Sequence, residues 1–460
     1  MSHGESDEQA RFASVTATLP GWTKATVLGV LLLNLVLLIV FAQRQSTSAN
    51  TDSRLATIEC LAHYGTFHID RSRYVGTIDK VRLNGHFLST KPPLLSSAAA
   101  LAYRVFAECT GRTFANDEAL SIYFVSVVTG VLPYMLLLVY FFLSLRLCIR
   151  RPAALALGML AIGVGNLGLG YATGINNHVP GALAVMGAFY HAMRTRQPAA
   201  GVHHWMLVGL WAGLTPVLDI ALAPFAIGFM IYLLAGNWRR TLLFSLPVFI
   251  IPLASHFVLN HAITGSFLPV YGRRELYNYP GSFWKPLLDA QGHVTPELLR
   301  KMGLEGMRDP KPLYVFNILL GHHGLFSMTP ILLLGVWQAV RCVRKRCTRL
   351  PEALLVLAPS VILVGLIAMR SRNYGGVCVG LRWMVGVMPL FFLFTAVWLD
   401  RRFSRRSVAV FVMLTLLGSF NAWDALQDPW KHSRWEQLLR PAVLEPDASL
   451  SPAPQDGGQP

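Results

Sequence analysis

Two short segments of the sequence combine side chains that can bind and transfer a charged group. Residues 51–54 (Thr-Asp-Ser-Arg) place Asp52 two positions before Arg54, directly after the first long apolar stretch. Farther along the chain, Lys91 precedes two prolines in residues 89–93 (Ser-Thr-Lys-Pro-Pro). A carboxylate can accept a proton, and guanidinium and ammonium groups neutralise anions. We therefore predict a site for an anionic, lipid-borne substrate where these two segments meet.

The two prolines give Lys91 a defined position. Proline holds the residue before it in an extended conformation and has no N–H, and Pro93 is well suited to begin a helix. Lys91 would then lie near a helix N-terminus, where its ammonium group and the helix dipole both favour an anion. We predict that Lys91 binds phosphate. The alternative is an ordinary basic residue at the level of the lipid headgroups.

Two roles are open for Asp52. Residues 51–53 can cap an amphipathic helix that lies along the membrane surface and ends at Gly65, and aspartate is a favoured capping residue. The same carboxylate, beside Arg54 at the mouth of a membrane span, can act as a general base. The sequence leaves both roles open, and we take Asp52 as the catalytic candidate.

The composition is that of a membrane protein. Of the 460 residues, 53% are hydrophobic and only 14% are charged, whereas soluble domains carry about 25% charged residues. The formal net charge is +16, which in a soluble protein would suggest nucleic acid as a partner. Here the basic residues cluster in short loops between apolar runs, as the positive-inside rule requires, so we expect no nucleic-acid partner.

The apolar runs predict an all-α polytopic bundle. About eleven spans are expected, at residues 24–42, 119–145, 152–170, 178–193, 204–218, 219–235, 241–260, 313–339, 353–369, 384–400 and 406–422. The apolar segment 93–108 is shorter than a full crossing and is expected to be interfacial or re-entrant.

The distribution of lysine and arginine sets the orientation. Basic residues concentrate in five short loops that we place on the cytoplasmic side, at residues 146–151, 194–203, 236–240, 341–349 and 401–406. This orientation gives a cytoplasmic tail over 1–23 and a transmembrane domain over 24–422. The outer face then carries a first loop with amphipathic helices over 43–118, a second long loop over 261–312, and a tail over 423–460 that is disordered at its end.

The first outer loop resembles that of a known family. The acid after the first span, Arg54, the helix ending in glycine and residues 84–95 (Asn-Gly-His-Phe-Leu-Ser-Thr-Lys-Pro-Pro-Leu-Leu) are similar to the GT-C glycosyltransferases. The likeness is greatest to the branch with protein O-mannosyltransferases and the lipid A aminoarabinose transferase. It covers about 45 residues closely. The family commonly has two adjacent acids where this chain has Thr51-Asp52.

The resemblance implies a function. Enzymes of this family take a sugar from a polyprenyl-phosphate donor, invert the anomeric carbon and use an outer-loop carboxylate to activate the acceptor. It implies that Asp52 is the base and that Arg54 and Lys91 bind the donor phosphate. The acceptor, a hydroxyl or amine on a glycan, lipid or protein, is not defined. We expect a multi-pass protein of the bacterial inner membrane with its active site facing outward.

A polar cluster without charge lies between two predicted spans. Asn176, Asn177 and His178 can hydrogen-bond a sugar or a phosphate, and they can equally cap the following helix. Asp219 lies at a span end beside Pro216, where the helix is expected to break. Acids inside the membrane are often functional, but an acid at the level of the headgroups is less often so.

One short outer loop, residues 370–383, is rich in arginine despite its expected side of the membrane. The planar guanidinium of arginine can donate two parallel hydrogen bonds to a phosphate, which lysine cannot. Arg372 and Arg382 are therefore predicted to bind the donor phosphate or, alternatively, lipid headgroups. In the same loop, Tyr374 or, alternatively, Trp383 is predicted to stack on a sugar ring.

Two adjacent histidines, His322 and His323, stand at the entry of a span between glycines. Metal sites on helices prefer histidines four residues apart, so we expect no metal here and count His322 as a substrate contact. No cofactor is expected, although the sequence leaves room for a divalent cation. The six cysteines show no CxxC pair, and Cys60 and Cys109 lie where a bridge is possible but not required.

Two other functions remain open. A transporter or flippase for a lipid-linked or anionic solute would show internal repeats and midplane charges, and neither pattern is evident in the sequence. A non-catalytic protein with a GT-C-like fold is the other alternative, since the first loop keeps a single acid.

Overall fold

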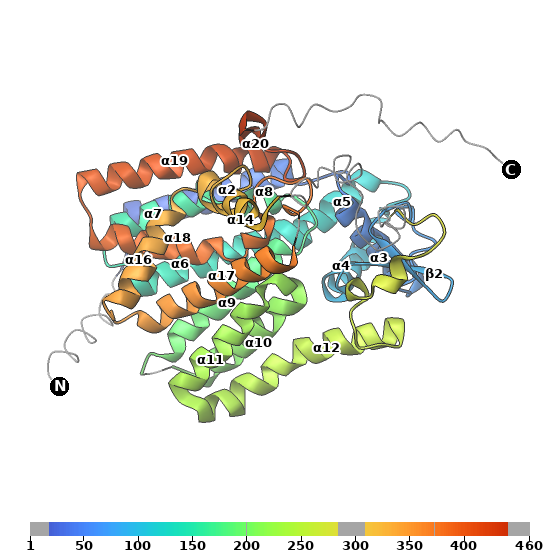
Figure 1. The fold of residues 1–460 in the computed structure, drawn as a ribbon, viewed down its shortest axis with the longest axis horizontal. Helices are drawn as coiled ribbons and strands as arrows, with labels where there is room; N and C mark the ends of the chain where they lie inside the picture. The colour runs from blue at the N-terminus through green and yellow to red at the C-terminus, as the bar shows by residue number, and fades with distance from the viewer. Residues whose placement is uncertain (1–17, 199, 284–308, 372, 440–460) are drawn as a thin grey trace.

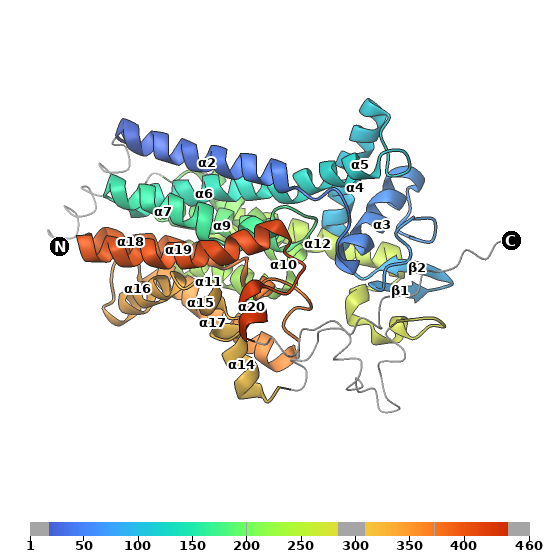
Figure 2. The same cartoon turned by 90° about the horizontal axis from the view of Figure 1, so that it is seen from above.

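The computed structural model of the chain describes residues 18–198, 200–283, 309–371 and 373–439. Most of its helices form one bundle, with a smaller cluster at one end (Figures 1 and 2). The bundle contains α2 (Gly21–Phe41), α6 (Leu132–Cys148), α7 (Pro152–Gly165), α8 (Gly168–Tyr171), α9 (His178–Thr195), α10 (Val202–Leu218), α11 (Ala223–Arg240), α12 (Leu246–Thr264), α14 (Lys311–Leu319), α15 (Leu325–Met328), α16 (Leu332–Arg344), α17 (Leu350–Arg370), α18 (Met388–Arg401), α19 (Arg405–Gln427) and α20 (Arg434–Leu439).

Short turns of 3-10 or π helix join several of these elements. They are η1 (Val127–Val131), η2 (Ile220–Leu222), η3 (Thr241–Ser245), η4 (Val270–Gly272), η5 (Arg274–Tyr277) and η8 (Arg382–Met384). The helix break expected at Asp219 is present: α10 ends at Leu218, and the Asp219 side chain accepts a hydrogen bond from the Ala221 N–H at the start of η2.

The smaller cluster is the first long loop. It contains α3 (Ala49–Tyr64), β1 (Lys80–Leu83), β2 (His86–Ser89), α4 (Pro93–Thr110) and α5 (Glu118–Ser126). Helix α12 extends out of the bundle and packs against α4, so it links the two parts (Figure 1). Cys60 in α3 and Cys109 in α4 are free thiols, so the bridge that the sequence allowed is not present.

The helix ends and the tight turn predicted for this loop are present in the structure. Gly65 ends α3 in the left-handed conformation, with φ 64°, and Pro93 is the first residue of α4. Asn84 and Gly85 both have positive φ, as the tight turn of an antiparallel hairpin requires. The all-α prediction therefore holds for the bundle, and the β1–β2 hairpin is an addition to it.

A buried carboxylate, Glu59 of α3, ties the loop together. It accepts hydrogen bonds from Ser72 Oγ at 2.6 Å and from the Arg73 N–H at 3.0 Å. Arg73 in turn donates to the Phe114 carbonyl, just before α5. A buried charge is tolerated when it is paired and hydrogen-bonded, so these contacts fix α3 against the chain on both sides of α4.

Five described helical stretches are long and apolar enough to cross a membrane. They are Gly21–Phe41, Glu118–Cys148, Ile220–Thr264, Leu350–Arg370 and Arg405–Gln427. These stretches support an integral membrane protein but do not establish the predicted count of about eleven spans. The predicted span 313–339 is wrong, because the chain is broken into α14, α15 and α16. Gly321 lies in the break between α14 and α15. A Cβ at this position would lie 2.8 Å from the Asn317 Cα, so the chain turns back too closely for any larger residue.

The packing of α8 against α19 yields a stability test. At Gly170 an added Cβ would lie 2.3 Å from the carbonyl carbon of Ala425, which is backbone and cannot rotate away. We expect Gly170→Ala to lower the melting temperature of the detergent-purified protein, since overpacking costs about 1–3 kcal/mol.

The matched control is Gly236→Ala in α11, where the added methyl group meets no atom within 4 Å. We expect this change to be neutral or slightly stabilising. Equal melting temperatures for the two variants would contradict the close packing of α8 on α19.

Candidate functional site

Asp52 lies in the first turn of α3 and does not cap it. The N-cap is Ser48, whose side chain accepts a hydrogen bond from the Thr51 N–H at 3.2 Å. The capping role that the sequence allowed for Asp52 is therefore wrong. Burial raises the Asp52 pKa, a hydrogen bond with Ser46 partly offsets this effect, and the charges of two nearby acids add to it. A partly buried carboxylate with a raised pKa is suited to accept a proton.

Arg54 joins the first loop to the bundle. Its side chain is buried, with the residue 4% exposed, and its guanidinium donates to the Asn177 Oδ1 at 2.7 Å and to the Asn50 carbonyl at 3.1 Å. Burial lowers the Arg54 pKa to about 10; Asp79 opposes this effect and Arg382 adds to it. Two predicted site residues, Arg54 and Asn177, are thus brought into direct contact across 123 residues of sequence.

Lys91 forms an ion pair that the sequence analysis missed. Its Nζ lies 2.7 Å from the Asp79 Oδ2, and both side chains are 15% exposed. The hairpin supplied a signal for this contact. Lys80 pairs with Ser89, so the next residues outward, Asp79 and Thr90, face each other, and the Thr90 N–H donates to the Asp79 carbonyl at 3.2 Å. A hairpin centred on Asn-Gly therefore places the acid beside Lys91.

The surroundings of Lys91 disfavour its charged form. Burial lowers its pKa from 10.5 to about 8, Asp79 raises it, and Arg54 and Arg382 lower it further. Because the latter two side chains act on Lys91 at once, the three cations share one electrostatic neighbourhood. They come from α3, from the loop before α4 and from η8, three segments far apart in the sequence.

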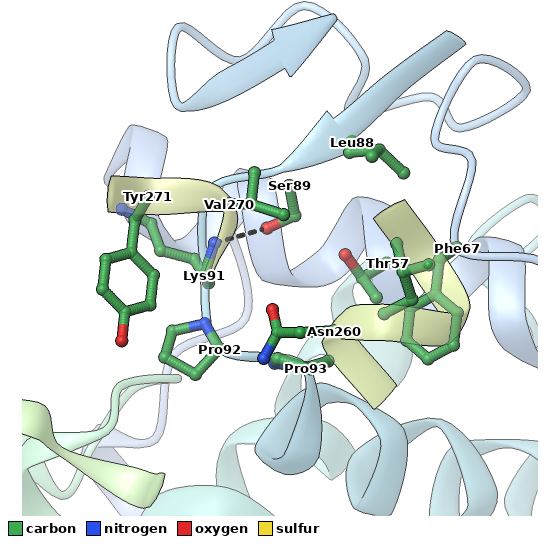
Figure 3. Close-up of a pocket in the computed structure, with 11 residues that line it drawn as sticks. Thr57, Phe67, Leu88, Ser89, Lys91, Pro92, Pro93, Asn260, Val270 and Tyr271 are labelled. Atoms are coloured by element: carbon green, nitrogen blue, oxygen red, sulfur yellow. Dashed lines mark hydrogen bonds between the residues drawn. The ribbon is translucent and has the colours of Figure 1, made fainter. Parts of the chain in front are cut away.

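A small, partly open cavity of about 20 Å³ lies next to Lys91 (Figure 3). Its wall includes Pro92 and Pro93 on one side and Asn260 and Tyr271 from the end of α12 and the turn after it. The Lys91 N–H donates to Ser89 Oγ at 3.1 Å, which fixes the backbone at the cavity edge (Figure 3). The prediction that Lys91 is held at the start of a helix is confirmed, since α4 begins two residues later.

Among the described residues, one hydrogen-bond donor of Arg382 has no acceptor. Its guanidinium carbon lies 5.3 Å from the ring centre of Trp430, and its buried Nε has no hydrogen-bond partner among the described residues. A buried donor without an acceptor costs about 1–3 kcal/mol, so this group is poised for an added anion. Arg372, the other predicted phosphate ligand of this loop, lies outside the described residues.

The polar side chains of the segment before α9 have different partners: Asn176 bonds to the backbone of the turn, and His178 pairs with Asp219. Asn176 is 1% exposed; its amide donates to two backbone carbonyls of the turn and its Oδ1 accepts from the His178 N–H at 2.9 Å. Asn176 therefore positions the turn and caps the start of α9, whereas the Asn177 side chain makes no capping hydrogen bond. His178 Nδ1 lies 2.7 Å from the Asp219 Oδ2, and both side chains are buried.

Tyr374 and His322 belong to a second cluster. The Tyr374 hydroxyl bonds with Asp309 and accepts from the Asn317 amide at 2.9 Å. Its ring, 4% exposed, already stacks against Tyr314 and His323. The predicted stacking of a sugar on Tyr374 would have to displace one of these rings. His322 is likewise buried, with its Nδ1 2.7 Å from the Nδ1 of His323.

Comparison with known proteins finds similar structures but no similar sequences. Neither the protein-family models nor the curated proteins include a match to the sequence. The aminoarabinose transferase ArnT from Cupriavidus metallidurans in its apo state is similar, with a TM-score of 0.56 and 15% identity. The same protein bound to undecaprenyl phosphate is similar with a TM-score of 0.55 and 17% identity.

Each of these likenesses covers 85% of this chain and 62% of ArnT, so the chain spans less than two thirds of ArnT. At such identities the likeness concerns the arrangement of the helices. It agrees with what residues 84–95 and the first outer loop led us to expect. This chain has the fold of the GT-C glycosyltransferases.

Proposed function

We propose that this chain is a membrane glycosyltransferase that takes a sugar from a polyprenyl-phosphate donor. The observation that carries the proposal is the gathering of Arg54, Lys91 and Arg382 in one neighbourhood where burial and mutual repulsion lower the pKa of the first two. Buried like charges are costly unless an anion offsets them. Asp79 offsets part of this charge, and a lipid phosphate would offset the rest.

The reaction follows from this arrangement. Asp52 takes the proton of the acceptor hydroxyl or amine, whose oxygen or nitrogen attacks the anomeric carbon. The bond between that carbon and the phosphate oxygen breaks, with inversion. The released polyprenyl phosphate carries more negative charge than the donor, and Lys91, Arg54 and Arg382 stabilise this charge as it develops. Because Asp79 lies 2.7 Å from Lys91, it holds the ammonium in place before the donor arrives.

Other features agree with this function. ArnT, similar in fold, has been solved with undecaprenyl phosphate, which supports a lipid phosphate as the ligand class. The basic loops expected on the cytoplasmic side support a first loop at the outer face of the membrane, which we propose to be a bacterial inner membrane. The donor would enter laterally from that leaflet. A transporter or flippase, or a non-catalytic member of the fold, is the alternative, and transfer of a sugar by the purified protein separates them.

Replacing the base tests the reaction. We expect Asp52→Asn to lower sugar transfer from undecaprenyl-phosphate-linked donors by about 10²–10⁴-fold, because a general base contributes that much. The measurement is donor consumption by purified protein in lipid nanodiscs, over a panel of such donors. The matched control is Glu108→Gln, since Glu108 is an exposed acid of the same loop that pairs with the exposed Arg104. Unchanged turnover in Asp52→Asn would exclude Asp52 as the base.

The role of Lys91 in phosphate binding can be tested even when the transferred sugar is not known. Undecaprenyl phosphate is the product of every such donor, and its phosphate is already ionised above pH 7. We expect its affinity for the wild-type protein to fall as pH rises through about 8, because Lys91 loses its proton there. In Lys91→Arg the charge persists and the affinity should stay level to higher pH.

Binding is measured by titration at a series of pH values, with Lys24→Arg as the control because Lys24 is exposed on α2. The control should follow the wild-type profile. If Lys91→Arg loses affinity over the same pH range as the wild type, Lys91 is not the group that titrates. If Lys91→Ala binds as tightly as the wild type, the ammonium does not contact the phosphate.

A further inference from the structure

A compact set of metal-binding side chains lies outside the proposed site. His322 and His323 stand in the break between α14 and α15, and Glu436 lies in α20. All three residues are buried, with exposures of 6%, 3% and 2%. Each offers one ligand atom, and these atoms lie within 4.8 Å of one another. More than a hundred residues of sequence separate the histidines from the acid, so only the fold brings them together.

The distances among these groups suit a small cation. His322 Nδ1 lies 3.9 Å from Glu436 Oε1, and His323 Nε2 lies 3.6 Å from Glu436 Oε2. Zinc bonds of roughly 2.0–2.1 Å in a tetrahedron separate neighbouring ligand atoms by about 3.3–3.4 Å. These two pairs therefore need to close by only a few tenths of an ångström, although the widest separation among the three ligand atoms, up to 4.8 Å, must close by more. His432 Nδ1 lies 3.0 Å from Glu436 Oε2 and helps to orient this carboxylate.

The chemical types of these side chains also suit a cation. Two imidazole nitrogens and one carboxylate oxygen are ligands that zinc and similar first-row divalent ions prefer.

We propose that His322, His323 and Glu436 bind one zinc ion. The expectation that no metal is held at the adjacent histidines considered only spacing along the chain, and Glu436 changes that reasoning. The ion would be structural, because its three ligands are buried and come from two distant segments that it would join.

The ion would fasten the C-terminal segment onto the bundle. The Trp435 Nε1 donates to the Gly321 carbonyl at 3.4 Å, directly beside the two histidines. The same segment carries Trp430, on which the Arg382 guanidinium rests. Loss of the ion would therefore loosen the segment that supports Arg382. The zinc site itself does not depend on the glycosyltransferase proposal.

The test uses the full-length protein purified without a polyhistidine tag. The protein is stripped with a chelator, incubated with zinc, passed through a desalting column and analysed for metal by mass spectrometry. We expect about one zinc per chain and a melting temperature several degrees above that of the stripped protein. Cobalt in place of zinc should give the intense visible absorption of a tetrahedral site.

Two variants and a control locate the ion. Glu436→Gln and His323→Asn should each abolish retention of zinc and the increase in melting temperature. His261→Asn, at an exposed histidine at the end of α12, should retain both. If a variant fails to fold, the wild-type stoichiometry and cobalt spectrum still decide. No zinc on the wild-type protein after desalting, or equal retention in folded Glu436→Gln, would overturn the proposal.

Discussion

The proposed site rests on the grouping of three cations, of which Arg54 is buried and Lys91 and Arg382 are half-buried. A buried charge loses hydration worth several kcal/mol, and the protein recovers this only through partners of the right geometry. Asn177 provides a carbonyl oxygen for Arg54, and Asp79 provides a carboxylate for Lys91. Arg382 finds an aromatic face but leaves its Nε without an acceptor among the described residues. This unequal satisfaction is what an anion-binding site requires before its ligand arrives.

The first loop is built to hold these charges still. Ser48 and Gly65 fix the two ends of α3, and Glu59 ties its middle to the turn that leads into the hairpin. The hairpin then sets Asp79 opposite Thr90, next to Lys91. Since each of these contacts lies within the loop, its shape does not require the ligand. The preformed loop reduces the ordering cost of binding, which is the usual advantage of preorganisation.

Local structure in this chain was predictable and distant contacts were not. The stop at Gly65, the turn at Asn84-Gly85 and the helix start at Pro93 each follow from the conformational preferences of one or two residues. The pairing of Glu436 with His322 joins segments that share no periodic pattern, so no local rule could indicate it. Apolar periodicity also missed the break inside 313–339, because the Gly321-His322-His323-Gly324 segment at the break is short and has apolar runs on both sides. Asp52 looked like a helix cap because the helix start lies only a few residues earlier, at Ser48.

A structure determined by electron cryomicroscopy with undecaprenyl phosphate bound tests the central claim most directly. The account predicts density for the phosphate within hydrogen-bonding distance of both Lys91 Nζ and the Arg382 guanidinium, with Asp52 facing the same cavity. A phosphate bound elsewhere, with the Lys91–Asp79 pair intact and Arg382 unchanged on Trp430, would contradict it.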